Sequence, residues 1–317
     1  MWTHLLFIVF GLVLLVFGGD WLVKASVSLA LKLKVSTLVI GLTVVSFATS
    51  APELIVSLSA ALQGYTDISF GNVIGSNIAN VGLILGVTAI IRPIIINVKS
   101  ARFDLFFLIL ITLLFYGLVV FDNSLGHLEG LALLLALSGF IFYKIRRSRI
   151  EKKSEIESSL EVPEEEVKPW KMIAYFILGA GALRYGAMFL VGHSVQLALT
   201  LGVDERLISV TVLAFGTSVP ELAASVIAAM KNESDIAFGN VVGSNLFNIG
   251  AVLGLTSVLT QIPVNNPHLF SFDYWWALGF SLLLVPLAAI GSFNKINRWE
   301  GGILLAAYFL YLFLIIK

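Results

Sequence analysis

The sequence predicts an all-α membrane protein with ten transmembrane helices arranged as two inverted five-helix repeats. The composition, the recurring apolar runs and an internal repeat support this fold class. Of the 317 residues, 58% are hydrophobic and 13% are charged, whereas soluble domains carry about 25% charged residues. Apolar stretches of about 18 residues or more, long enough to cross a bilayer, recur along the whole chain. A soluble protein with a large core is therefore a poor alternative.

The ten predicted helices are separated by polar segments. We interpret the first apolar run, 5–23, as a retained helix, because it lacks the basic start and the cleavage site of a signal peptide. The predicted helices cover 3–30, 36–62, 68–92, 102–121, 127–145, 170–199, 205–230, 236–260, 271–291 and 298–316. The predicted domains are a first five-helix repeat over 1–145, a cytoplasmic linker over 146–169 and a second five-helix repeat over 170–317.

The basic residues predict the orientation in the cell membrane. With the amino terminus outside, sixteen of the 20 Lys and Arg residues lie in inside loops or at their edges, as the positive-inside rule requires. The even helix count then places both termini outside the cell. The linker contains a basic and an acidic cluster, and we interpret it as a solvated segment. A regulatory cation site is the alternative, but the linker has no EF-hand pattern.

An internal repeat aligns the two halves at an offset of 168 residues. Between 46–90 and 214–258, 23 of the 45 positions are identical. Because each repeat contains an odd number of predicted helices, the second repeat must enter the membrane with the opposite orientation. Inverted repeats are typical of secondary transporters, whose substrate site lies near mid-membrane between the halves.

Each repeat carries a Thr-Ser-x-Pro-Glu motif inside an apolar run, from Thr49 to Glu53 and from Thr217 to Glu221. A charged side chain at mid-membrane costs about 2.5–3.5 kcal/mol on insertion scales. The proline also frees a backbone carbonyl one turn earlier. A lone membrane glutamate can be structural, but two at the same repeat position, each after a proline, indicate a binding site.

The next helix of each repeat carries Gly-Asn-Val-x-Gly-Ser-Asn-x-x-Asn, which ends at Asn80 or at Asn248. Polar residues four positions apart in this motif share one helical face. The ligand set of both motifs is all oxygen, with no Cys in the chain and no His in either motif. Such a set suits Na⁺, Ca²⁺ or Mg²⁺ rather than Zn²⁺ or Cu. Two carboxylates balance one Ca²⁺, and Mg²⁺ gives up its water reluctantly, so we expect Ca²⁺ as the divalent ion.

Some charged residues break the internal symmetry. Asp20 and Lys24 lie one helical turn apart and predict a local ion pair, whereas the matching positions in the second repeat are Met188 and Gly192. This asymmetry favours a structural or gating role over ion binding. Arg184 and His193 also lack matching partners, and we expect them near helix ends or interfaces.

The paired Thr-Ser-x-Pro-Glu motifs, each followed by Gly-Asn-Val-x-Gly-Ser-Asn, resemble the two alpha repeats of the Ca²⁺/cation antiporter superfamily. The prokaryotic Na⁺/Ca²⁺ exchangers are the branch that the chain resembles, over essentially its whole length. The resemblance implies a non-enzymatic antiporter whose first and sixth helices slide past a core of the other eight. It implies no cofactor, because Ca²⁺ and Na⁺ bind as substrates. The expected surroundings are the lipid bilayer, with no nucleic acid, and we expect a functional monomer.

The resemblance also implies the ion ligands. Ca²⁺ would be held by Glu53 and Glu221 with backbone oxygens at Thr49 and Thr217. Na⁺ would use the same glutamates together with Ser50, Ser218, Ser76, Ser244, Asn80, Asn248 and the carbonyls of Ser46 and Ala214.

The chain departs from the family's pattern in two places. Asn80 and Asn248 are amides where some members carry Asp, so the site has only two carboxylates. Ser46 stands where Ala occurs in the second repeat. The Thr-Ser pair before each glutamate favours Na⁺ as the counter-ion, and a Ca²⁺/H⁺ antiporter with the same glutamates is the nearest alternative. A channel or a structural membrane protein explains the duplicated motifs less well.

Overall fold

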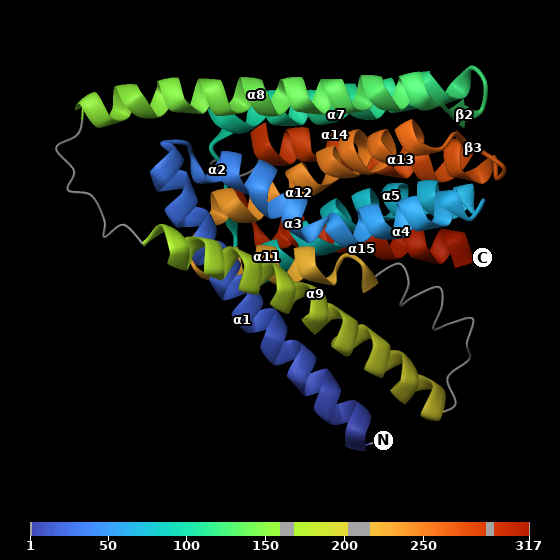
Figure 1. Cartoon of the computed structure of the whole chain (residues 1–317), viewed down its shortest axis with the longest axis horizontal. Coiled ribbons are helices and arrows are strands. Elements are labelled where there is room, and N and C mark those ends of the chain that lie inside the picture. The colour runs from blue at the N-terminus through green and yellow to red at the C-terminus, as the bar shows by residue number, and fades with distance from the viewer. Residues whose placement is uncertain (1, 159–167, 202–215, 290–294, 317) are drawn as a thin grey trace.

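The computed structural model describes residues 2–158, 168–201, 216–289 and 295–316, which are built almost entirely from helices (Figure 1). The labels η1 to η4 denote π-helical segments. The first half contains α1 (Trp2–Leu33), α2 (Thr37–Ile40), η1 (Gly41–Val45), α3 (Ser46–Thr49), α4 (Ala51–Leu62), α5 (Thr66–Ala79), η2 (Asn80–Leu85), α6 (Gly86–Ile91), β1 (Ile94–Ile95), α7 (Val98–Val120), β2 (Ser124–Leu125) and α8 (His127–Ser158). The second half contains α9 (Pro169–Thr200), α11 (Val219–Met230), α12 (Ser234–Phe247), η3 (Asn248–Leu253), α13 (Gly254–Leu259), β3 (Ile262–Pro263), η4 (Leu269–Asp273), α14 (Tyr274–Ala289), β4 (Lys295–Ile296) and α15 (Arg298–Ile316).

The described helices confirm a multi-pass membrane protein. Eight of them are long and apolar enough to cross a membrane, and the number is nine if the bent pair Thr37–Thr49 and Ala51–Leu62 forms one span. The predicted helix over 205–230 lies partly outside the described residues, and its described part is the short helix α11. The total of ten helices therefore stays a prediction.

The offset of 168 residues found in the sequence recurs in the structure. Four elements of the first half, α4, α5, η2 and α6, have counterparts in α11, α12, η3 and α13 whose first and last residues are each 168 positions later. Two short antiparallel pairings, which were not predicted, also join the halves. Strand β1 pairs with β4, and β2 pairs with β3.

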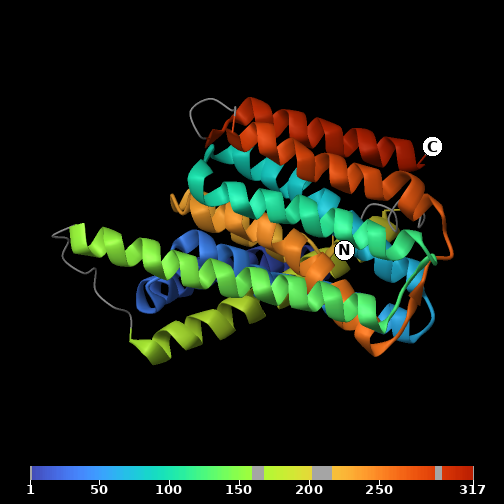
Figure 2. The ribbon, with the colours of Figure 1, turned by 90° about the horizontal axis from the view of Figure 1, so that it is seen from above.

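The helices with the Gly-Asn-Val-x-Gly-Ser-Asn motif lie at the centre of the bundle. In Thr66–Ile91 and Ser234–Leu259, 72% and 83% of the apolar membrane-length stretch is buried, compared with 22–39% in the other six helices. Figure 2 shows α14 and α15 along one side of the bundle and α8 toward the other. The outer helices therefore separate the polar motif from the surrounding lipid.

Helices α1 and α9 lie side by side and extend away from the other helices at an angle (Figure 1). Their contact is close because glycines face each other. A Cβ atom added to Gly11 would lie 2.7 Å from the carbonyl oxygen of Gly186, and one added to Gly18 would lie 3.0 Å from that of Gly179. Residue numbers rise along one helix as they fall along the other, so the two helices are antiparallel.

The predicted ion pair on α1 is confirmed and extends to a second helix. Lys24 Nζ lies 2.8 Å from Asp20 Oδ2. Asp20 also pairs with Lys231, which directly follows α11. The aspartate thus joins α1 to the end of α11.

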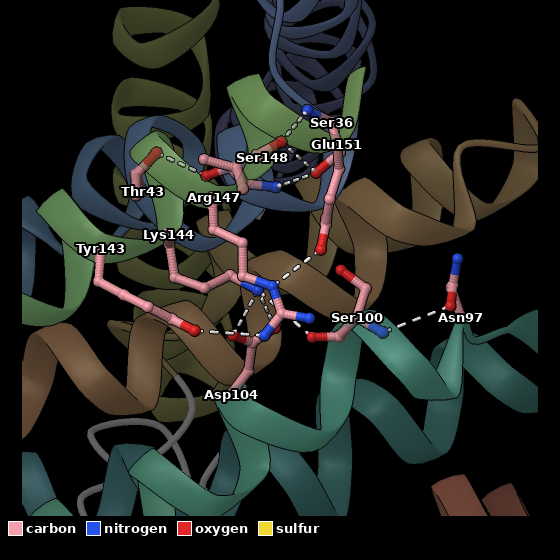
Figure 3. Close-up of polar contacts among 11 residues, drawn as sticks. Ser36, Thr43, Asn97, Ser100, Asp104, Tyr143, Lys144, Arg147, Ser148 and Glu151 are labelled. Atoms are coloured by element: carbon pink, nitrogen blue, oxygen red, sulfur yellow. Dashed lines mark hydrogen bonds and ion pairs between the residues drawn. The ribbon is translucent and has the colours of Figure 1, made fainter. Parts of the chain in front are cut away.

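Helix α8 continues to Ser158, so the prediction that the fifth helix ends at residue 145 was wrong. The added part is polar, which is why hydrophobicity alone missed it. Lys, Arg and Glu are good helix formers, and charges four positions apart support one another on a helix surface. One such pair is present, with Arg147 Nε donating to Glu151 Oε1 at 2.8 Å (Figure 3).

A buried ion pair fastens α8 to α7 (Figure 3). Lys144 Nζ lies 2.7 Å from Asp104 Oδ1 and donates to the carbonyl oxygen of Ser100 at 3.3 Å. Lys144 is 5% exposed and Asp104 is fully buried. Each charge therefore needs the other for its stabilisation, since neither has free access to water.

Candidate cation-binding site

The site begins at a break in the second membrane helix. Helix α3 ends at Thr49, Ser50 has φ −85° and ψ 5°, and α4 begins at Ala51, with a bend of 47° between the two parts. Pro52 explains the break because it has no N–H to donate to the carbonyl one turn earlier. Glu53 consequently lies in the first turn of α4, where the helix dipole favours a negative charge.

The second half repeats this geometry. Ser218 has φ −88° and ψ 1°, and α11 begins directly after it with Pro220 in its first turn. Glu221 therefore occupies the same place in α11 that Glu53 occupies in α4. The sequence predicted one continuous helix over 36–62, and the structure corrects this, because the helix is divided at Ser50.

The two glutamates face the opposite repeat. Both are only 1% exposed. Ser50 Oγ donates to Glu221 Oε1 at 3.1 Å, and Thr49 Oγ1 donates to Asn240 Oδ1 at 3.2 Å, also in the opposite repeat. Thr217 hydrogen-bonds in turn to Glu53. The structure therefore places Ser50 beside the carboxylate of Glu221 and Thr217 beside that of Glu53.

Charge around the carboxylates is unbalanced among the residues that the structure describes. Glu53 and Glu221 are close enough to repel each other, and Arg184 of α9 exerts a weaker attraction on Glu53. Glu53 Oε2 and Glu221 Oε2 are buried without a hydrogen-bond partner among the described residues. Two buried carboxylates with free oxygens in a membrane provide strong negative charge for a cation.

The amides Asn80 and Asn248 begin the π-helical segments η2 and η3, and they are oriented by the opposite repeat. Asn80 Nδ2 donates to Asn245 Oδ1 at 2.9 Å, and Asn248 Nδ2 donates to Asn77 Oδ1 at 3.0 Å. Because the NH₂ groups are engaged, the oxygens Oδ1 of Asn80 and Asn248 are the free ends, and no described residue donates a hydrogen bond to either. Each amide thus presents an acceptor.

Two other amides brace the glutamate helices. Asn72 Nδ2 donates to Ser57 Oγ at 2.9 Å and to the Glu53 carbonyl at 3.2 Å. In the second half, Asn240 Nδ2 makes the same two contacts, to Ser225 Oγ at 3.0 Å and to the Glu221 carbonyl at 3.3 Å. These bonds fix each glutamate helix against the following helix.

The remaining predicted ligands differ in their surroundings. Ser218 and Ser244 have buried hydroxyls without a hydrogen-bond partner among the described residues, and Ser76 is buried. The Ser46 hydroxyl donates to the Gly41 carbonyl at 2.5 Å, so the candidate ion ligand of this residue is its backbone carbonyl oxygen. Ala214 lies outside the described residues.

The unpartnered oxygens define the chemistry of the site. In the part of the chain that the structure describes, six buried oxygens without a hydrogen-bond partner belong to predicted ligands: Glu53, Glu221, Asn80, Asn248, Ser218 and Ser244. A buried polar atom without a partner costs about 1–3 kcal/mol. A protein that leaves several buried oxygens unpaired despite this cost is typical of a binding site for a hard cation, which takes oxygen ligands.

Sequence reasoning missed the roles of Asn77 and Asn245. Both stand in the recognised motif, but their position about a quarter-turn from the shared face gave no reason to expect contact across the repeats. The recurring Asn-x-x-Asn spacing, Asn77 to Asn80 and Asn245 to Asn248, was the available signal. Each half supplies the amide that orients the other half's acceptor.

Comparisons with known proteins find relatives over nearly the whole chain. A family model described as "Sodium/calcium exchanger protein" matches residues 3–146 and 171–317. CaxA of Alkalimonas amylolytica is 37% identical over 98% of both chains, and the sodium/calcium exchanger MaX1 of Methanosarcina acetivorans is 32% identical over 98% of this chain and 97% of its own. A structure of the sodium-calcium exchanger NCX_Mj soaked with 2.5 mM Na⁺ and 10 mM Sr²⁺ has a TM-score of 0.81 and 31% identity, with 97% of each chain covered. The Ca²⁺/H⁺ antiporter ChaA of Bacillus subtilis is more distant, at 27% identity over 82% of this chain and 78% of its own.

Proposed function

Since the chain belongs to the sodium/calcium exchanger protein family, we propose that it is an antiporter that exchanges Na⁺ for Ca²⁺ across the cell membrane. It carries both ions as substrates and needs no enzymatic step or cofactor. The observation that carries this proposal is the cluster of unpartnered buried oxygens around Glu53 and Glu221. The relatives named for sodium and calcium exchange support the choice of ions.

The two carboxylates explain why the ions exclude each other. Glu53 and Glu221 together supply two negative charges, which one Ca²⁺ neutralises. Na⁺ ions that neutralise the same carboxylates leave no uncompensated charge for Ca²⁺. Binding of one substrate therefore requires release of the other, which is the electrostatic basis of exchange.

The proposed ligands follow from this scheme. Ca²⁺ is bound by the carboxylates of Glu53 and Glu221 with the backbone oxygens of Thr49 and Thr217. Na⁺ is bound by the same carboxylates with Ser50, Ser218, Ser76, Ser244, Asn80, Asn248 and the carbonyls of Ser46 and Ala214.

We also propose that the protein alternates access through ten helices in two inverted repeats, works as a monomer, and has both termini outside the cell. The antiparallel packing of α1 against α9 supports inversion, because these helices hold equivalent positions in the two halves. Their close glycine contact supports movement of the pair as one body.

The test is Ca²⁺ flux in proteoliposomes. Vesicles loaded with Na⁺ and diluted into Na⁺-free medium that contains ⁴⁵Ca²⁺ should take up Ca²⁺ with the pH clamped equal on both sides. Glu53→Gln should abolish this uptake because it removes one of the two charges that face the ion. Glu151→Gln is the matched control, since this exposed residue lies on α8 outside the site.

Two results would contradict the proposal. Full uptake by Glu53→Gln would remove Glu53 from the site. Uptake driven by a proton gradient and unaffected by Na⁺ would instead favour Ca²⁺/H⁺ antiport, which the likeness to ChaA keeps as the second candidate.

A further inference from the structure

The packing of α1 against α9 places two histidines opposite each other. Gly18 faces Gly179, and Gly11 faces Gly186, so the contact recurs every seven residues along both helices. Seven residues are nearly two helical turns, so they return to the same face. The next step in this register joins His4 with His193.

The two imidazole rings meet as this register requires. His4 Nδ1 lies 3.0 Å from His193 Nδ1, and the ring centroids are 5.3 Å apart. Phe7 stacks on His193 with centroids 4.5 Å apart and planes tilted by 11°. The His193 ring is therefore held in place, while both histidines keep partial exposure.

We propose that His4 and His193 form a two-imidazole site for a borderline transition-metal ion, of the class of Zn²⁺ or Cu²⁺. Zn²⁺ binds imidazole nitrogen at about 2.0–2.1 Å in tetrahedral geometry, which sets two ligand nitrogens about 3.3 Å apart. The observed 3.0 Å requires only a small outward shift of the rings. No other His, Asp or Glu of the described residues completes a three-residue cluster here, so water fills the remaining positions.

Metal binding replaces a shared proton. When both rings of the metal-free pair are neutral, one ring carries its proton on Nδ1 and donates it to the other Nδ1, so the two rings are different tautomers. When the ion binds, both Nδ1 atoms become ligands, and the donor ring carries its proton on Nε2 instead. The bound ion then links α1 to α9 near the start of α1.

This site is chemically distinct from the oxygen cluster. Ca²⁺ and Na⁺ prefer oxygen ligands, whereas imidazole suits Zn²⁺ and Cu²⁺. The histidines lie on α1 and α9, outside the motifs that carry Glu53 and Glu221. The inference therefore stands independently of the ions that the protein transports.

The experiment titrates Cu²⁺ and Zn²⁺ into the full chain, purified with an affinity tag that contains no histidine. Electron paramagnetic resonance of the Cu²⁺ complex should show hyperfine coupling to two imidazole nitrogens. His4→Gln and His193→Gln should each remove one nitrogen and weaken Zn²⁺ binding by at least about tenfold, since even outer-shell changes cost about 10–100-fold in metal sites. His127→Gln and His268→Gln, in other elements, should leave both readouts unchanged.

Glu53→Gln separates this site from the oxygen cluster, because Zn²⁺ binding should survive the loss of that carboxylate. Zn²⁺ should also raise the melting temperature of the parent protein and not that of His193→Gln, whose own folding is checked by its elution as a single species. Unchanged Cu²⁺ coupling in His193→Gln would overturn the proposal, since His193 would then not be a ligand. Loss of Zn²⁺ binding in Glu53→Gln would overturn it as well.

Discussion

Asn245 should control Ca²⁺ affinity although we do not propose it as a ligand. Asn245→Ala removes the oxygen to which Asn80 Nδ2 donates at 2.9 Å. The Asn80 amide is then free to rotate, and its NH₂ group, which cannot bind a cation, competes with Oδ1 for the position that faces the site. The buried NH₂ also loses its partner, which costs about 1–3 kcal/mol.

If this cost falls on the Ca²⁺-binding state, the half-saturating Ca²⁺ concentration rises by about 5- to 140-fold, since about 1.4 kcal/mol corresponds to tenfold in affinity. The assay is initial ⁴⁵Ca²⁺ uptake into Na⁺-loaded proteoliposomes over a range of Ca²⁺ concentrations. Asn77→Ala, the counterpart that releases Asn248, should give a loss of similar size because its bond is 3.0 Å long.

Asn97→Ala is the matched control, since Asn97 caps α7 away from the site. An Asn245→Ala protein that folds, transports, and keeps the parent's half-saturating Ca²⁺ concentration would refute the reasoning. It would show that the orientation of the Asn80 amide does not matter for binding.

Two further predictions concern the scaffold. Asp104→Asn leaves the buried Lys144 ammonium without its ion partner and should destabilise the protein by about 3–5 kcal/mol; a melting temperature in detergent equal to that of the parent would contradict this. Gly11→Ala places a methyl group 2.7 Å from the Gly186 carbonyl oxygen, so it should separate α1 from α9 and reduce Ca²⁺ flux. Gly117→Ala, whose added methyl group meets nothing within 4 Å, should transport normally, and equal flux in the two variants would show that the close contact is dispensable.

The sequence was most informative where a chemical rule acts locally. The missing N–H of Pro52 and Pro220 frees a backbone carbonyl one turn earlier, and the backbone leaves helical geometry at Ser50 and at Ser218, directly before α4 and α11. The burial of Glu53 and Glu221 followed from their place in apolar runs and from the repeat offset. These features depend on a few neighbouring residues and on a motif that occurs in both internal repeats.

The features that escaped prediction depend on contacts between distant segments. Nothing in the local pattern says that Asn80 bonds to Asn245, because this contact requires η2 and α12 to be placed against each other first. The change from α- to π-helix at Asn80 also alters the angular spacing on which a helical-face argument relies. The extension of α8 beyond residue 145 was missed for a different reason, since its polar end is helical without being apolar.

The reciprocal bonds between the halves have a consequence for how the protein can be assembled. Ser50 reaches Glu221, Asn80 reaches Asn245, and Asn248 reaches Asn77. A chain divided between α8 and α9 would therefore give two fragments, each with polar groups that only the other can satisfy. Such fragments should be degraded when each is produced alone and should recover Ca²⁺ flux when they are produced together, as two genes in place of one.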